Sequence, residues 1–111
     1  TRKTGKQMSE QEEKLLNLIQ QYKAATGIIS VVEDYTGVSI NQPTRKRPVC
    51  DARQIAMYLI KQNTGLTLMQ TARLCGLGTH AAAWHACRQV PLYLETDRAY
   101  REKYGDLINF N

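Results

Sequence analysis

The stretch that decides the fold lies at residues 67–90 and reads TLMQTARLCGLGTHAAAWHACRQV. Thr67 is a typical N-cap for a short helix over residues 68–75, and Thr79 is a typical N-cap for a longer helix through Val90. Gly76 lies between them and is free to take the positive φ of a tight turn. Ala72 leaves room for the two helices to cross closely. This pattern predicts a helix-turn-helix.

Two further helices are predicted upstream, over residues 9–25 and 28–35, with Gly27 ending the first. Ser9 and Glu12 have the spacing of a capping box. The first helix carries an apolar stripe that we expect to be buried, formed by Leu15, Leu16, Ile19 and Tyr22. Residues 28–35 are rich in β-branched side chains that a strand would also accommodate. The turn at Gly37 ends this segment.

Two more helices complete the prediction. Asp51 is a candidate N-cap for a helix that ends near Gly65, and its buried stripe consists of Ile55, Ala56, Leu59 and Ile60. Pro91 is expected to stop the helix that begins after Thr79, and residues 94–108 form a last amphipathic helix. The fold class is therefore all-α, a compact helical domain of about six helices around a helix-turn-helix.

Positive charge is concentrated in the middle of the chain. The 111 residues contain 15 basic and 10 acidic side chains, a net charge of +5. Residues 41–90 hold seven bases against Asp51 alone, a net of +6 (7 − 1): Arg45, Lys46, Arg47, Arg53, Lys61, Arg73 and Arg88. A domain that presents one surface to a polyanion has its excess positive charge concentrated in this way. The densest run lies in an extended loop between Pro43 and Pro48 rather than on an amphipathic helix, which favours nucleic acid over a membrane.

Metal binding, catalysis and membrane insertion have little support in the sequence. His80, His85 and Cys87 would share one helix, where positions 80 and 85 lie about 140° apart and positions 85 and 87 about 200° apart, so they do not converge on zinc. No GxSxG or HExxH motif occurs, and we expect neither an enzyme nor a cofactor. The three cysteines suit reduced thiols, and no apolar run approaches the roughly 18 residues that span a bilayer. We expect a soluble, cytoplasmic protein.

Three segments between residues 28 and 108 stand out together: Arg45-Lys46-Arg47, ARQIAMYL at residues 52–59, and His80 followed by HACR at residues 85–88. In this order and spacing they resemble the C-terminal DNA-binding domain of the bacterial chromosomal replication initiator DnaA, including the Trp-repressor type of helix-turn-helix. The resemblance implies an all-helical domain over residues 28–111 whose helix-turn-helix reads short boxes of double-stranded DNA. Residues 1–27 would be an N-terminal tail and a connector-like helix.

The resemblance also implies a set of DNA-binding residues. Arg45 would enter the minor groove from the basic loop that it shares with Lys46 and Arg47, since a narrow A/T groove attracts arginine. Arg53 and Gln54 would reach base edges, and Lys61 would contact a phosphate. The remaining positions lie on the helix that would enter the major groove, namely Thr79, His80, Ala81, Ala82 and Arg88.

The start of this helix departs from the family pattern. The family has Gly-Arg-Asp-His-Thr-Thr-Val, whereas residues 77–83 read LGTHAAA. The polar groups that would read bases are missing, while Ala81 and Ala82 retain methyl groups that suit thymine. We therefore expect altered or relaxed specificity with phosphate affinity largely kept. Trp84 replaces a smaller apolar residue and has no assigned role.

The most favoured function is thus double-stranded DNA binding of the replication-initiation type. The chain contains no GxxxxGK[ST] phosphate loop, which leaves open a parent chain that carries an ATPase domain. One alternative is a transcriptional regulator or mobile-element protein that uses the same helix-turn-helix at another site. A less favoured alternative is a protein-interaction module whose basic face meets an acidic protein. The oligomeric state is left open.

Overall fold

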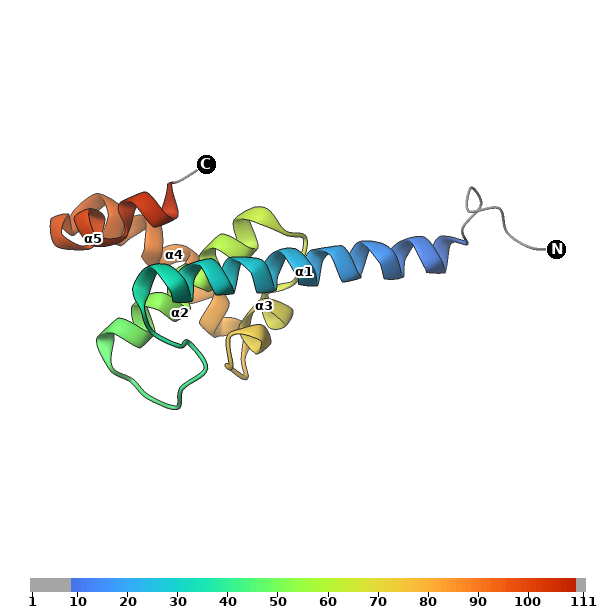
Figure 1. Cartoon of the computed structure of the whole chain (residues 1–111), viewed down its shortest axis with the longest axis horizontal. Coiled ribbons are helices and arrows are strands. Elements are labelled where there is room, and N and C mark those ends of the chain that lie inside the picture. The colour runs from blue at the N-terminus through green and yellow to red at the C-terminus, as the bar shows by residue number, and fades with distance from the viewer. Residues whose placement is uncertain (1–8, 110–111) are drawn as a thin grey trace.

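A computed structural model describes residues 9–109, which contain helices and connections but no strand (Figure 1). Helix α2 packs against α1, α3 and α4, while α4 also packs against α3 and α5. The predicted all-α class is confirmed, with five helices in this range rather than about six: α1 (Glu10–Thr36), α2 (Arg47–Asn63), α3 (Leu68–Leu74), α4 (His80–Thr96) and α5 (Arg98–Ile108).

Helix α1 is one continuous helix where the sequence predicts two. Ser9 and Glu12 form the predicted capping box at its start. Gly27 does not end the helix, although a glycine inside a helix costs about 1 kcal/mol relative to alanine. Ala25 and Val32 are fully buried, and this packing outweighs the cost. The helix ends at Gly37, whose φ is 74°. The domain boundary predicted at residues 27 and 28 falls inside α1 and stays a prediction.

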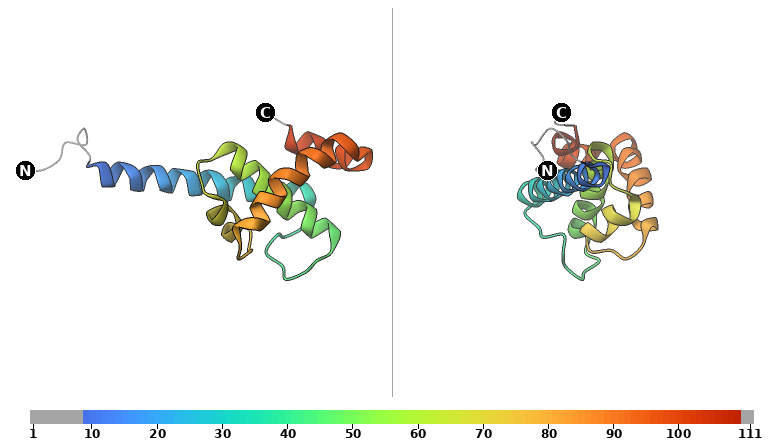
Figure 2. Two further views of the ribbon diagram at one scale, coloured as in Figure 1. Left: turned by 180° about the vertical axis from the view of Figure 1, so that it is seen from behind. Right: turned by 90° about the vertical axis from the view of Figure 1, so that its right-hand side faces the viewer.

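The N-terminal half of α1 extends beyond the rest of the molecule, as two views show (Figures 1 and 2). Leu15, Leu16 and Ile19 are 58%, 45% and 40% exposed, so their predicted burial is wrong. Tyr22 is half-buried and packs at the edge of the core. The stripe has helical spacing, but this half of α1 projects beyond the other helices (Figures 1 and 2). The predicted tail falls largely on residues 1–8, which lie outside the described residues.

Helix α2 begins at Arg47, and the prediction that Asp51 is its N-cap is wrong. Pro48 fits the first turn because the N–H that proline lacks has no partner there in any helix. Asp51 is instead buried within the helix and accepts hydrogen bonds from Arg47 Nε at 2.9 Å and from Tyr104 Oη at 3.3 Å. The predicted stripe is confirmed as core, since all four members are at most 4% exposed: Ile55, Ala56, Leu59 and Ile60.

Helix α4 continues through Pro91 to Thr96, so the predicted stop at this proline is wrong. Proline inside a helix costs about 3 kcal/mol. Buried Val90 and the partly buried Tyr93 and Leu94 pack against the core on both sides of it, which offsets that cost. The last helix begins at Arg98 rather than 94, because Asp97 caps it by accepting a hydrogen bond from the Tyr100 N–H at 3.0 Å.

Candidate nucleic-acid interface

The predicted helix-turn-helix is confirmed in α3 and α4. Thr67 caps α3, with its hydroxyl accepting from the Gln70 N–H at 3.1 Å while Gln70 Oε1 accepts from the Thr67 N–H at 2.9 Å. The turn depends on Gly76, whose φ is 80°. The N–H of Leu77 then bonds to the Ala72 carbonyl at 2.9 Å, and this closes the end of α3.

The basic loop, residues 38–46, lies against this turn. A Cβ atom placed on Gly76 would come within 2.7 Å of Asn41 Oδ1, closer than real Cβ contacts. Glycine is therefore required here for its positive φ, and a Cβ atom would also displace the Asn41 amide group. A groove lined by residues from both segments and from α2 marks the contact: Ile40, Asn41, Gln42, Pro43, Arg53 and Gly76. Loop and turn project from the same side of the molecule in two opposite views (Figures 1 and 2).

Arg53 of α2 fixes the start of the loop. Its Nε donates to the Ile40 carbonyl at 3.2 Å, and its Nη2 donates to the Gln42 carbonyl at 2.7 Å. Glu33, near the end of α1, accepts from the Ile40 N–H at 3.0 Å. The Arg53 guanidinium thus faces main-chain oxygens of the loop, and its predicted contact with bases stays a prediction.

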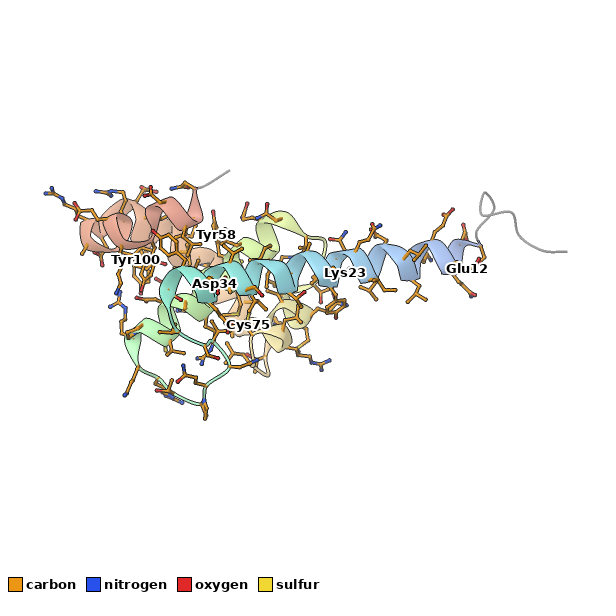
Figure 3. All side chains as sticks on the ribbon, viewed as in Figure 1. Glu12, Lys23, Asp34, Tyr58, Cys75 and Tyr100 are labelled. Atoms are coloured by element: carbon orange, nitrogen blue, oxygen red, sulfur yellow. The ribbon has the colours of Figure 1, made fainter. Side chains whose placement is uncertain are left out.

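Cys75 is buried at the C-cap of α3, directly before Gly76 in the turn (Figure 3). Burial raises the pKa of its thiol to about 12, while the charge of Arg53 opposes the shift and that of Glu33 adds to it. The thiol is therefore protonated at neutral pH and acts as a core group. We use the name loop–turn junction for the five residues that meet here, Glu33, Asn41, Arg53, Cys75 and Gly76.

The three basic residues of the predicted arm are not placed alike. Arg45 and Lys46 are exposed in the loop. Arg47 is the first residue of α2, pairs with Asp51 at 2.9 Å, and holds its guanidinium 5.8 Å from the centre of the Tyr93 ring. The structure therefore joins Arg47 to the α4–α5 end of the molecule rather than to the loop–turn junction.

The first turn of α4 is open to an anion. Thr79, its N-cap, makes no side-chain capping hydrogen bond, and the turn contains no acidic residue. Main-chain N–H groups and the positive end of the helix dipole therefore remain available for a phosphate. Thr79, His80 and Ala81 are exposed, whereas Ala82 is half-buried against the core. Three of the four predicted positions at this end thus share an accessible surface.

The other predicted positions lie further from the junction or are partly covered. Lys61 is half-buried, and its Nζ donates to the Leu66 carbonyl at 2.7 Å between α2 and α3. Gln54 is half-buried on α2 next to Arg53. Arg88 is exposed on α4. Their contacts with DNA stay predictions.

Two features of the site were missed by sequence reasoning. The Arg88 guanidinium carbon lies 4.9 Å from the centre of the Trp84 ring, and Trp84 is 52% exposed. The spacing of four residues on one helix was a usable signal for this pair. The loop contacts of Arg53 had no such signal, because their acceptors are main-chain oxygens in an irregular segment.

Within residues 9–109, no group of three or more His, Cys, Asp or Glu side chains is arranged to hold a metal ion. In the same range, no helix combines the length and apolar character that crossing a bilayer requires.

The chain is similar to chromosomal replication initiator proteins DnaA. The protein of Bacteroides thetaiotaomicron is 35% identical over 74 residues, which is 67% of this chain and 16% of the relative. That of Flavobacterium psychrophilum is 33% identical over 100 residues, 87% of this chain and 21% of the relative. The chain thus spans about a sixth to a fifth of the length of these relatives. No solved structure matches. The sequence pattern of the family described as bacterial DnaA protein helix-turn-helix matches residues 25–90, more than half of the chain, and the chain therefore belongs to this family.

Proposed function

We propose that this chain binds double-stranded DNA, with the N-terminal turns of α4 in the major groove and the basic loop in the adjacent minor groove. The observation that carries the proposal is the loop–turn junction. It holds the loop with Arg45 and Lys46 beside the turn that leads into Thr79 and His80, so one duplex meets both.

The charge of the segment that contains this surface fits a polyanion. Residues 41–90 carry a net charge of +6, and their single acid, Asp51, is buried against Arg47 and Tyr104. The uncapped start of α4 adds main-chain donors to this surface. We propose that the activity is binding without catalysis and that it serves replication initiation, as the names of the relatives indicate.

Binding is expected to be salt-dependent and, through Arg45, selective for narrow minor grooves. The logarithm of the affinity should fall against the logarithm of salt concentration with a slope of about −3 to −6, for roughly four to six neutralised phosphates. Arg45→Ala should weaken binding to A/T-rich duplexes more than to G/C-rich ones. Fluorescence anisotropy of labelled duplexes over a salt series measures both.

The matched control for Arg45→Ala is Arg98→Ala, which removes the same charge from α5 at an exposed ion pair with Glu102. It should change neither the affinity nor the A/T preference appreciably. Absence of binding at low salt contradicts the proposed function and favours an acidic protein as the partner. Equal losses on both duplex types contradict the minor-groove position of Arg45.

We further propose that the DNA specificity differs from that of the standard initiator box. Supporting this, Ala81 is exposed in the first turn of α4 and offers only a methyl group, while the half-buried Ala82 is less available to a base. Restoring threonine at both positions should raise the preference for the standard box over scrambled DNA, with Ala81→Thr giving most of the effect. Affinities for the two duplexes measure it, and an unchanged ratio would show that these positions do not face bases.

A selection of bound duplexes from a random pool by the unaltered chain gives its preferred site. The sequence of that site distinguishes an origin-type box from the site of a transcriptional regulator or mobile element.

A further inference from the structure

The exposed face of α4 pairs Arg88, one of the predicted DNA-binding residues, with the aromatic side chain of Trp84. The buried face of this helix consists of Ala83, Ala86 and Val90. Trp84 and Arg88 lie four residues apart on the opposite face, with the guanidinium carbon over the indole, 4.9 Å from the centre of the ring. Half of the large apolar Trp84 side chain remains exposed, at 52%.

Resting on the proposed DNA binding, we propose that Trp84 is a positioning residue that holds the Arg88 guanidinium against a phosphate of the duplex on the far wall of the major groove. Stacking covers one face of the guanidinium and leaves its edge N–H groups free. A phosphate accepts two such donors side by side.

The helix geometry places this pair over the duplex when the start of α4 is in the groove. Ala81 and Arg88 are seven residues apart, so they lie within about 20° of each other around the helix and about 10 Å apart along it. The major groove is about 12 Å wide. A helix whose first turn reaches base edges with Ala81 therefore brings Arg88 to the phosphates at the opposite edge of the groove.

The stack also makes Arg88 ready for this contact. Within residues 9–109, no carboxylate lies at ion-pair distance from Arg88, so its charge is not neutralised inside the described chain. A free arginine gives up rotamer freedom when it is fixed on a phosphate, and a side chain already stacked on an indole gives up less. Removing Trp84 should therefore weaken DNA binding mainly by loosening Arg88.

The test uses the full chain and a short labelled duplex of mixed sequence at low salt. Arg88→Ala should weaken binding about tenfold, as expected for a lost charge-assisted hydrogen bond, and should make the salt slope shallower by about 0.9. Trp84→Ala should weaken binding about two- to fivefold, the range expected from an exposed cation–π contact. In the double variant the two losses should not multiply, because Trp84 acts through Arg88. Trp84→Phe keeps an aromatic face and should restore most of the affinity.

Trp84 is the single tryptophan of the chain, which gives an independent readout. Adding duplex should change its fluorescence and shield it from a soluble quencher. Leu92→Ala, at an exposed apolar residue on the same helix, is the matched control and should leave the affinity unchanged. Circular dichroism shows whether each variant is folded.

Multiplying losses in the double variant, or unchanged Trp84 fluorescence when the labelled duplex is fully bound, overturns the positioning role while the proposed function stands. Absence of any binding by the unaltered chain at low salt overturns both.

Discussion

Replacing Arg53 with alanine is expected to weaken duplex binding at least about tenfold while the helical core stays folded. Arg53 donates to the carbonyls of Ile40 and Gln42 and so fixes the start of the basic loop. A hydrogen bond from a charged group contributes about 1.5–3 kcal/mol, and about 1.4 kcal/mol corresponds to a tenfold change in affinity. Without these bonds, ordering the loop on DNA costs conformational entropy at the moment of binding. Anisotropy measures the affinity, and thermal unfolding checks the core.

A double variant separates a loop-holding role of Arg53 from direct contact with DNA. If Arg53 acts through the loop, Arg45→Ala should cost much less affinity when Arg53 is already alanine. The preference for A/T-rich duplexes should then be small in Arg53→Ala and in the double variant alike. Arg98→Ala again controls for the loss of one charge. Fully multiplying losses would indicate that Arg53 contacts DNA by itself, and an unchanged affinity would show that the loop is held by other contacts.

Replacing Asp51 with alanine should lower the free energy of unfolding by about 2–4 kcal/mol, a large share of a small domain's stability. Its buried carboxylate joins the start of α2 to α5 by accepting from Arg47 and from the Tyr104 hydroxyl. Burial, followed by the charge and hydrogen bond of Asp51, raises the pKa of Tyr104 to about 12, so the phenol stays neutral and donates. Losing the acceptor leaves a buried hydroxyl without its partner. Urea unfolding followed by circular dichroism gives the change.

Two variants serve as controls for Asp51→Ala. Asp51→Asn keeps an acceptor oxygen and should lose less stability. Asp106→Ala removes an exposed carboxylate on α5 and should change the free energy of unfolding by no more than about 0.5 kcal/mol. If Asp51→Ala unfolds at the same urea concentration as Asp106→Ala, the carboxylate does not join α2 to α5 in solution.

Local signals predicted the features that depend on neighbours in the sequence. The capping box at Ser9, the N-cap at Thr67 and the positive φ of Gly76 arise within a few residues, and the structure confirms the helix starts and the turn. Gly27 and Pro91 misled the prediction because their local penalties, about 1 and about 3 kcal/mol, are outweighed by side chains that pack against distant helices. Asp51 misled the prediction of where α2 begins, because an aspartate that can cap a helix can also act as a buried acceptor. Pro48 is well suited to the first turn of a helix and allowed α2 to begin earlier, at Arg47.

The candidate site was predictable as a surface but not as a set of contacts. The DNA-binding roles that the resemblance implies for Arg45 and His80 require both side chains to be exposed, and both are. That Arg53 faces loop carbonyls depends on the path of an irregular segment, which residue types alone do not determine. The turning of Arg47 towards Tyr93 depends on α4 continuing past Pro91, which the sequence did not predict, and the contact of Arg47 with DNA stays a prediction.

The unbroken course of α1 through Gly27 has a geometric consequence. Because the helix is continuous from Glu10 to Thr36, the number of residues in α1 sets the angular position of Ser9 about the helix axis relative to α4. Each residue inserted into the projecting half would rotate that end by about 100° around the helix axis and move it by about 1.5 Å along the axis. Seven inserted residues would return it almost to the same angular position. The length of α1 thus determines the direction in which the start of the described chain points relative to the surface proposed to lie on DNA.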